Sequence, residues 1–139
     1  MISFKNKLVA IINKDIDVGV AMNSLAHATL GLGAQLSPEE LRLDNYRNKN
    51  NNVYPNISQM PFIILRGKSN EIRKTITSVK EHNDIIYTVF INTMTGGTYF
   101  EQLENTKNTP EENIIYYASV IYGDWQKVTE ITRKLSLYK

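Results

Sequence analysis

The sequence has no cysteine among its 139 residues and only two histidines. The absence of cysteine excludes disulfides, a thiol nucleophile and cysteine-ligated zinc. Two histidines are too few for us to expect a zinc site with histidine ligands. We therefore expect no metal and no cofactor. Long apolar runs are also missing. The N-terminal run Leu8–Ile12 has five residues and is too short to cross a bilayer or to form a signal-peptide core. These absences predict a cytoplasmic protein with no membrane contact.

An excess of charge of one sign is missing as well. The chain has 16 basic and 14 acidic residues, a net charge of +2. This balance is too mild to indicate nucleic-acid binding by itself, so tRNA as a partner has only weak support. A chain of 139 residues with 42% hydrophobic residues predicts one domain, able to bury roughly two-thirds of its unfolded surface.

The stretch from Leu8 to Gly33 predicts a strand followed by a helix. The run Leu8–Ile12 lacks polar alternation, which is typical of a central strand covered on both faces. Small and apolar residues over 18–32 predict a helix close to the sheet, capped by Asp17 and ended by Gly33. Helical spacing predicts a sheet-facing side made of Val18, Met22, Leu25, Ala28 and Leu32.

Strand and helix patterns alternate along the rest of the chain. We predict strands over Phe62–Leu65, Ile85–Asn92 and Tyr116–Tyr122, and helices over Ser69–His82, Asp124–Leu135 and around Tyr99–Leu103. Ser37-Pro38 and Thr109-Pro110, each followed by two glutamates, predict further short helices, and residues 44–56 are interpreted as an exposed polar loop. This order predicts a single α/β domain over residues 1–139, with a largely parallel four-stranded sheet covered on both faces.

A candidate site follows from this topology. Ligands usually bind beyond the carboxyl ends of parallel strands, which would bring Asn23 and His27 of the first helix near Thr95 and Thr98 of the loop after the third strand. Histidine can move protons near neutral pH, while hydroxyls and loop N–H groups can hold an anion. The alternatives are a packed structural histidine and an ordinary tight turn at 95–98.

Three segments resemble an uncharacterised bacterial family related to type II peptidyl-tRNA hydrolases. They are KLVAIINKDIDVGVAMNSLAHATLGLGA, YPNISQMPFIIL and YYASVIYGDWQKVTEITRKLSLYK. The resemblance implies a peptidyl-tRNA hydrolase II-like fold, a three-layer α/β/α arrangement with a four-stranded mixed sheet. It also implies cleavage of the ester that joins a peptide to tRNA. Asp15, Gly19 and Ala26-His27-Ala28 match the family's order of aspartate, turn glycine and histidine-bearing helix.

The departures from this family bear on activity. Residues 20–22 are Val-Ala-Met where the hydrolases place lysines, so the expected cation near phosphate or the developing oxyanion is absent. The family's Asp-Ala-Gly-Arg-Thr loop corresponds to 94–98, where Gly96 and Thr98 match but the aspartate and arginine do not. Replaced polar groups on a retained fold indicate a changed function, since fold alone does not determine chemistry.

Three functions are compatible with these residues, and whether the chain is an enzyme stays open. The preferred one is a non-hydrolase small-ligand-binding or regulatory protein that takes an anionic or nucleotide-like molecule in a cleft near His27 and Thr98, the tentative catalytic pair. The second is a peptidyl-tRNA hydrolase with a reduced site, and the third is a structural homodimer that uses an edge strand or the aromatic last segment. The residues assigned to ligand binding are Gly19, Asn23, Thr95, Gly96 and Gly97.

Overall fold

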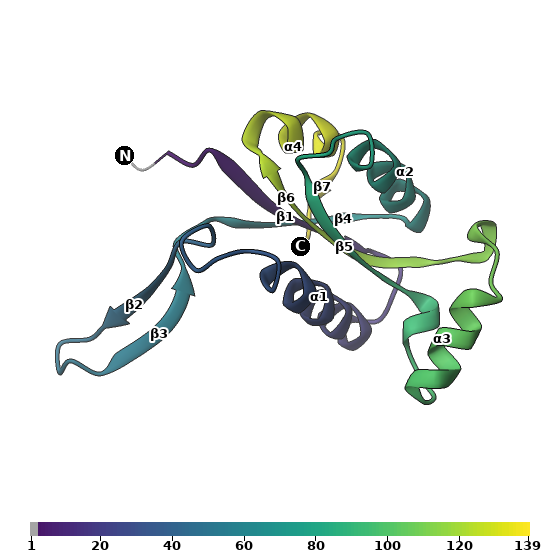
Figure 1. The fold of residues 1–139 in the computed structure, drawn as a ribbon, viewed down its shortest axis with the longest axis horizontal. Helices are drawn as coiled ribbons and strands as arrows, with labels where there is room; N and C mark the ends of the chain where they lie inside the picture. The colour runs from purple at the N-terminus through teal and green to yellow at the C-terminus, as the bar shows by residue number, and fades with distance from the viewer. Residues whose placement is uncertain (1–2) are drawn as a thin grey trace.

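The computed structural model describes residues 3–139 and has a mixed α/β fold (Figure 1). Its strands are β1 (Asn6–Asn13), β2 (Leu43–Arg47), β3 (Val53–Ser58), β4 (Phe62–Gly67), β5 (Ile86–Ile91), β6 (Tyr116–Asp124) and β7 (Ser136–Leu137). Its α-helices are α1 (Val18–Gly33), α2 (Ser69–Val79), α3 (Tyr99–Lys107) and α4 (Trp125–Thr132), and the 3-10 turns η1 (Asn92–Met94) and η2 (Glu111–Asn113) flank α3. No helix within residues 3–139 is long and apolar enough to cross a membrane.

Five strands form the main sheet in the order β5-β6-β1-β4-β7. Only β1 and β4 pair in parallel, while β6 is antiparallel to both β1 and β5, and β7 is antiparallel to β4. The prediction of a largely parallel four-stranded sheet is therefore wrong. Because α3 and η2 stay near the end of β5 instead of crossing the sheet (Figure 1), β6 returns antiparallel. The short strand β7 adds the fifth strand.

The central strand β1 is buried on both faces, as the unbroken apolar run predicted. Val9 and Ile11 lie in a core with residues of α2 and α4, whereas Leu8, Ala10 and Ile12 lie in a second core with residues of α1. The sheet is thus covered by α1 on one face and by α2 and α4 on the other (Figure 1).

The sheet-facing side of α1 agrees with the prediction at Leu25, Ala28 and Leu32 and differs from it in the first half of the helix. Val18 and Met22 are 66% and 67% exposed, and the side chains buried against the sheet are Ala21, Ser24, Ala28 and Leu32. Because this helix contains no Asp, Glu, Lys or Arg, hydrophobic spacing alone does not single out one face. Ser24 tolerates burial because its hydroxyl donates a 2.7 Å hydrogen bond to the Val20 carbonyl. The small buried residues allow the helix to lie close to the sheet.

The region predicted as a polar loop is exposed but folds into a hairpin. Strands β2 and β3 pair with each other alone and project from the body (Figure 1). A backbone hydrogen bond of 2.9 Å from Gln59 to Arg42 closes the base, and Asn51 has φ of 65° in the turn. The sequence did not predict these strands, because the hairpin contributes few side chains to the core and its composition is therefore polar. We call residues 42–59 the arm.

The two proline-marked helix starts give different outcomes. Ser37 and Glu40 form a capping box, with hydrogen bonds of 3.0 Å in both directions. No helix follows, because the backbone enters the left-handed region at Arg42, with φ of 55°, so that prediction is wrong. After Pro110 the chain forms one short 3-10 turn, η2.

Candidate functional site

The carboxyl ends of three strands meet at one edge of the sheet. Strand β4 runs parallel to β1, and β5 runs in the same direction because β6 is antiparallel to both β5 and β1. The first turns of α1 and α2 and the turn η1 therefore lie at this edge. The sequence predicted a site here, and the structure brings the predicted segments to this edge, although it gives their side chains other partners.

Asn13 organises the buried part of this edge. Its side chain is 3% exposed, its Nδ2 donates to the Tyr116 carbonyl at 2.8 Å, and its Oδ1 accepts from the Asp15 N–H at 2.8 Å. The Tyr116 N–H in turn donates to Ser69 Oγ at 2.9 Å. This network joins β1, β6 and α2. Sequence reasoning missed Asn13, for which the one signal was a polar residue at the end of an apolar run.

The residues predicted in the Thr95–Thr98 loop maintain the local backbone. Thr98 caps α3, since its hydroxyl accepts from the Glu101 N–H at 3.2 Å and donates to Glu101 Oε1 at 3.1 Å. Thr95 donates to the Asn92 carbonyl at 2.9 Å. Gly96 and Gly97 have φ of 73° and 65°, left-handed conformations that glycine adopts without steric cost. This geometry matches an ordinary tight turn.

His27 lies on the α1 side of the sheet, with its ring exposed. The imidazole stacks on Phe90, with 5.3 Å between ring centroids and 23° between ring planes. Asn23, one helical turn earlier, is also exposed. Within residues 3–139 no hydrogen bond joins His27 to Asn23 or to the 95–98 turn, so the structure does not assemble these residues into one bonded constellation. Asp17 occupies the helix cap position, but its carboxylate accepts no capping hydrogen bond, in contrast to the prediction.

A hollow of about 350 Å³ opens on the opposite face of the sheet, between α2, β5 and α3. We call it the β5–α3 hollow. Most of its wall is apolar, with a few polar groups at one side, which is the make-up typical of small-molecule sites. It is lined by Ile76, Lys80, Tyr87, Val89, Ile91, Met94, Thr106, Thr109, Glu111, Ile114 and Tyr116.

A hydrogen-bonded pair at this hollow perturbs a tyrosine. The Tyr116 hydroxyl donates to Glu111 Oε1, and burial, reinforced by that bond and by the charge of Glu111, raises the pKa of Tyr116. Arg73 lies 5.2 Å from the ring centroid and donates to the carbonyls of Glu111 and Ile114 at 3.0 and 2.6 Å. Sequence reasoning placed Tyr116 at the start of a predicted strand and missed the hollow, because the residues that line it are spread along the chain from Ile76 to Tyr116.

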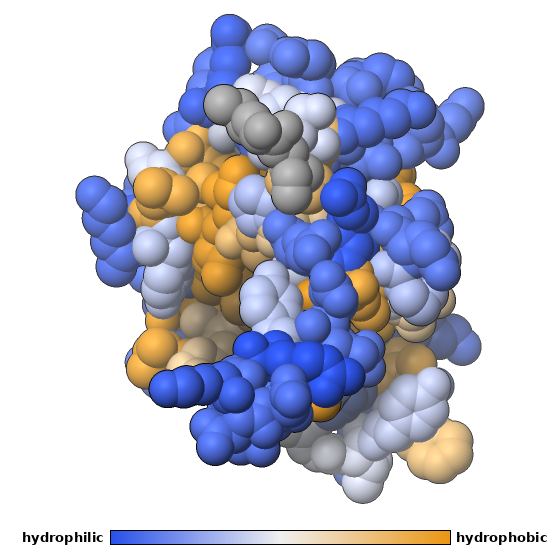
Figure 2. Space-filling view, turned by 90° about the vertical axis from the view of Figure 1, so that its left-hand side faces the viewer, coloured by the Kyte–Doolittle hydropathy of each residue, from blue (hydrophilic) through white to orange (hydrophobic). Residues whose placement is uncertain are grey.

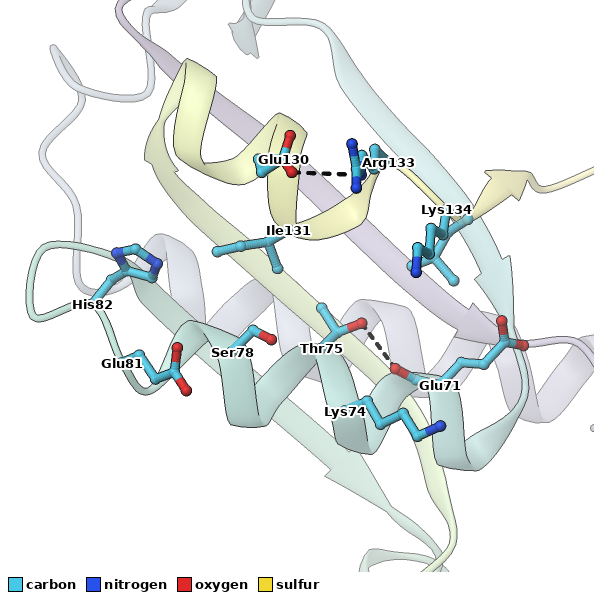
Figure 3. Close-up of a pocket in the computed structure, with 11 residues that line it drawn as sticks. Glu71, Lys74, Thr75, Ser78, Glu81, His82, Glu130, Ile131, Arg133 and Lys134 are labelled. Carbon is cyan, nitrogen blue, oxygen red and sulfur yellow. Dashed lines mark hydrogen bonds and ion pairs between the residues drawn. The ribbon is translucent and has the colours of Figure 1, made fainter.

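A second groove, of about 550 Å³, lies between α2 and α4 (Figure 3). Its charges are balanced, with three carboxylates (Glu71, Glu81 and Glu130) and three cations (Lys74, Arg133 and Lys134). The Glu130–Arg133 ion pair of 3.5 Å is exposed and contributes little. The second histidine, His82, also lines this groove. Across residues 3–139 no three His, Asp or Glu side chains gather in a way that could hold a metal ion.

Comparison with known proteins gives a family and a shared fold. The model of a family described as "Protein of unknown function (DUF2000)" matches residues 6–139. No protein of curated function matches the sequence. The solved structure of Atu0240, a protein of unknown function from Agrobacterium tumefaciens strain C58, superposes with a TM-score of 0.84 at 21% identity, covering 99% of this chain and 100% of that one. At this identity the likeness shows the fold alone.

Proposed function

This chain belongs to the DUF2000 family of proteins of unknown function, and we propose that it is a small-ligand-binding domain whose ligand occupies the β5–α3 hollow. The observation that carries the proposal is the lining of this 350 Å³ hollow, an apolar wall with the Tyr116–Glu111 pair at one side. The proposal keeps the binding function expected from the sequence. It moves the ligand from the His27–Thr98 region to the other face of the sheet.

The wall of the hollow favours an amphipathic ligand with a compact apolar or aromatic body. Tyr87, Val89 and Ile91 alternate along β5, so their side chains point to the same face of the sheet. Tyr87 and Val89 are half-buried by the protein itself. A ligand that completes their burial gains about 25 cal/mol per Å² of apolar surface removed from water.

The polar groups at the hollow select the other end of the ligand. Glu111 favours a cationic or hydrogen-bond-donating group, and Lys80 favours an anion. Tyr116 is neutral at physiological pH, as an ordinary tyrosine is, and its hydroxyl proton is donated to Glu111, so its oxygen can only accept a hydrogen bond from a ligand. These groups support recognition, and we assign no reaction to them.

Three probes of equal size test the site and its charge preference. We would titrate benzylamine, benzyl alcohol and benzoate into isotopically labelled protein and follow backbone amide shifts by NMR. We expect saturable shifts at Val89, Ile91 and Thr106 for at least one probe. The replacement Val89→Phe, which fills the hollow, should abolish these shifts. Val53→Phe on the exposed arm is the matched control and should leave them unchanged. Shifts confined to the surroundings of His27 and Thr98 would overturn the proposal and restore the site expected from the sequence.

A further inference from the structure

The exposed hydrophobic side chains of this protein are concentrated on one side of the sheet. Among residues 3–139, α2 and α4 carry no large hydrophobic residue that is exposed. The arm, α1 and α3 carry ten: Val18, Met22, Leu30, Tyr46, Val53, Tyr54, Ile57, Tyr99, Phe100 and Leu103. These three elements lie in a row below the sheet, with the arm at one end and α3 at the other (Figure 1). Ten of the fourteen exposed large hydrophobic residues within 3–139 therefore belong to this row, and the other four are Met94, Ile115, Leu137 and Tyr138.

The middle of this row is the outer surface of α1. Leu30 is 73% exposed there, and the helix has no Asp, Glu, Lys or Arg over its 16 residues. A Cβ added to Gly19 or Gly33 would meet nothing within 4 Å, so packing within the chain does not require these glycines. Depletion of charged residues is typical of the centre of a protein interface.

A groove beside α1 extends this apolar surface. It has a volume of about 760 Å³, and Leu25 and Leu30 of α1 face Phe62 and Ile64 of β4 across it. Figure 2, which views the molecule from the end where the arm projects, shows hydrophobic side chains gathered in a hollowed part of this face, among hydrophilic ones.

Helix α3 presents its polar side to the protein and its apolar side to solvent. Gln102 donates to the Gly96 carbonyl at 3.0 Å, and the hydroxyl of Thr106 lies 2.7 Å from that of Thr93. Tyr99 and Phe100, whose rings are tilted by 51° to each other with 6.1 Å between centroids, are 69% and 78% exposed. Within residues 3–139 the two rings contact each other and are otherwise largely exposed, which leaves them available to a partner surface.

The charges at the two ends of the row are complementary. The arm carries three basic residues (Arg42, Arg47 and Lys49) and one acidic residue (Asp44), a net charge of +2. The segment 99–113, which contains α3 and η2, carries four acidic residues (Glu101, Glu104, Glu111 and Glu112) and Lys107, a net charge of −3. A partner that meets both ends must offer the opposite charge at each.

We propose that the partner is a second copy of this chain, related by a two-fold axis that passes beside the middle of α1. This axis packs α1 antiparallel against its counterpart and brings the basic arm of each copy onto the acidic α3 segment of the other. A two-fold interface requires one self-complementary surface, and a basic end and an acidic end on either side of an apolar centre provide it.

The size of a stable interface explains why all three elements are needed. Such an interface buries about 800 Å² on each partner, roughly one-eleventh of the 9122 Å² surface of this chain. Helix α1, about 24 Å long and about 10 Å wide, presents a strip well below that area. The arm and α3 supply the rest. The β5–α3 hollow opens on the other face of the sheet but shares Glu111 with the acidic segment, so the charge swap uses Glu104 and Glu112, which do not line the hollow.

Light scattering coupled to size-exclusion chromatography tests the apolar centre. We expect a dimer mass for the wild type at about 100 μM. Leu30→Asp should give a monomer with an unchanged far-UV circular dichroism spectrum, because Leu30 is outside the core. Leu137→Asp, at a residue on edge strand β7 that is 55% exposed, is the matched control and should remain dimeric. A monomeric wild type would overturn the proposal, as would dissociation by Leu137→Asp in place of Leu30→Asp.

A charge swap tests the pairing of the ends. Arg47→Glu with Lys49→Glu, and separately Glu104→Lys with Glu112→Lys, should each weaken dimerisation at least tenfold at low salt. The chain that carries all four changes should recover it, because both ends have then changed sign. A quadruple variant as weak as the pairs would show that the arm does not meet the partner's α3, and the proposed arrangement would be wrong.

Discussion

The hydroxyl of Tyr116 donates a hydrogen bond to the carboxylate of Glu111, and both residues line the same side of the β5–α3 hollow. The guanidinium of Arg73 lies over the tyrosine ring and donates to the carbonyls of Glu111 in η2 and of Ile114 just after it. These contacts join α2, η2 and β6. The polar side of the hollow is therefore held in place by contacts within the chain, and this preorganisation lowers the entropic cost of binding for the proposed ligand.

The raised pKa of Tyr116 gives the stability a defined pH dependence. Burial, followed by the bond to Glu111 and its charge, raises the pKa of the folded state above the value of about 10 in the unfolded chain. The folded state therefore holds the phenolic proton more tightly. Its contribution is complete below pH 10 and is lost as the pH rises through the folded pKa. We expect the unfolding free energy to fall more steeply above pH 10 in the wild type than in Tyr116→Phe.

Urea unfolding between pH 7 and pH 11 measures this difference. The two proteins share all other tyrosines, so the background titration is the same in both. Parallel curves above pH 10 would contradict the assignment. At pH 7 the variant should lose about 1 kcal/mol, the typical net value of one hydrogen bond.

Replacing Arg73 should destabilise the region around the hollow. Arg73→Ala removes two hydrogen bonds from a charged donor to backbone carbonyls, together with the contact over the Tyr116 ring. We expect a loss of about 2 to 3 kcal/mol in chemical unfolding. Arg133→Ala is the control. Its exposed ion pair with Glu130 should contribute less than about 1 kcal/mol. Equal effects of the two variants would refute the role of Arg73.

Two asparagines allow a direct comparison of a buried and an exposed side chain. Asn13→Ala leaves the Tyr116 carbonyl and the Asp15 N–H without their partners, so we expect a loss of about 2 kcal/mol. Asn23→Ala changes an exposed side chain and should alter the unfolding free energy by less than about 0.5 kcal/mol. Thermal and urea unfolding measure both changes. If Asn13→Ala leaves the free energy of unfolding unchanged, water can replace the hydrogen bonds of Asn13.

The hydrolase expectation can be tested with a purified peptidyl-tRNA at low salt, where weak phosphate contacts are strongest. We expect no peptide release, because residues 20–22 carry no lysine and the Thr98 hydroxyl serves the α3 cap. Turnover that disappears in His27→Ala would contradict this prediction and would make His27 a functional residue.

Strand and helix positions were largely readable from the sequence, whereas the site was not. The run at β1 and the pattern of α2 each predicted their element, because local spacing reflects which side chains leave water. The hollow could not be predicted, since Val89 and Tyr116 resemble ordinary core residues until the fold brings them beside Glu111 and Thr106. The turn at 95–98 was located correctly, but its hydroxyls bind the local backbone.

The sequence by itself determined that the chain forms a buried strand followed by an uncharged helix, and that cysteine chemistry is excluded. Tertiary structure decided the strand order, the exposed side of α1 and the position of the hollow. The physical reason lies in α1 itself. It has no charged residue and carries apolar side chains on all sides, so the sequence does not distinguish the face that meets the sheet from the face that stays exposed. Packing against β5 and β6 makes that choice, and it leaves Val18, Met22 and Leu30 outside.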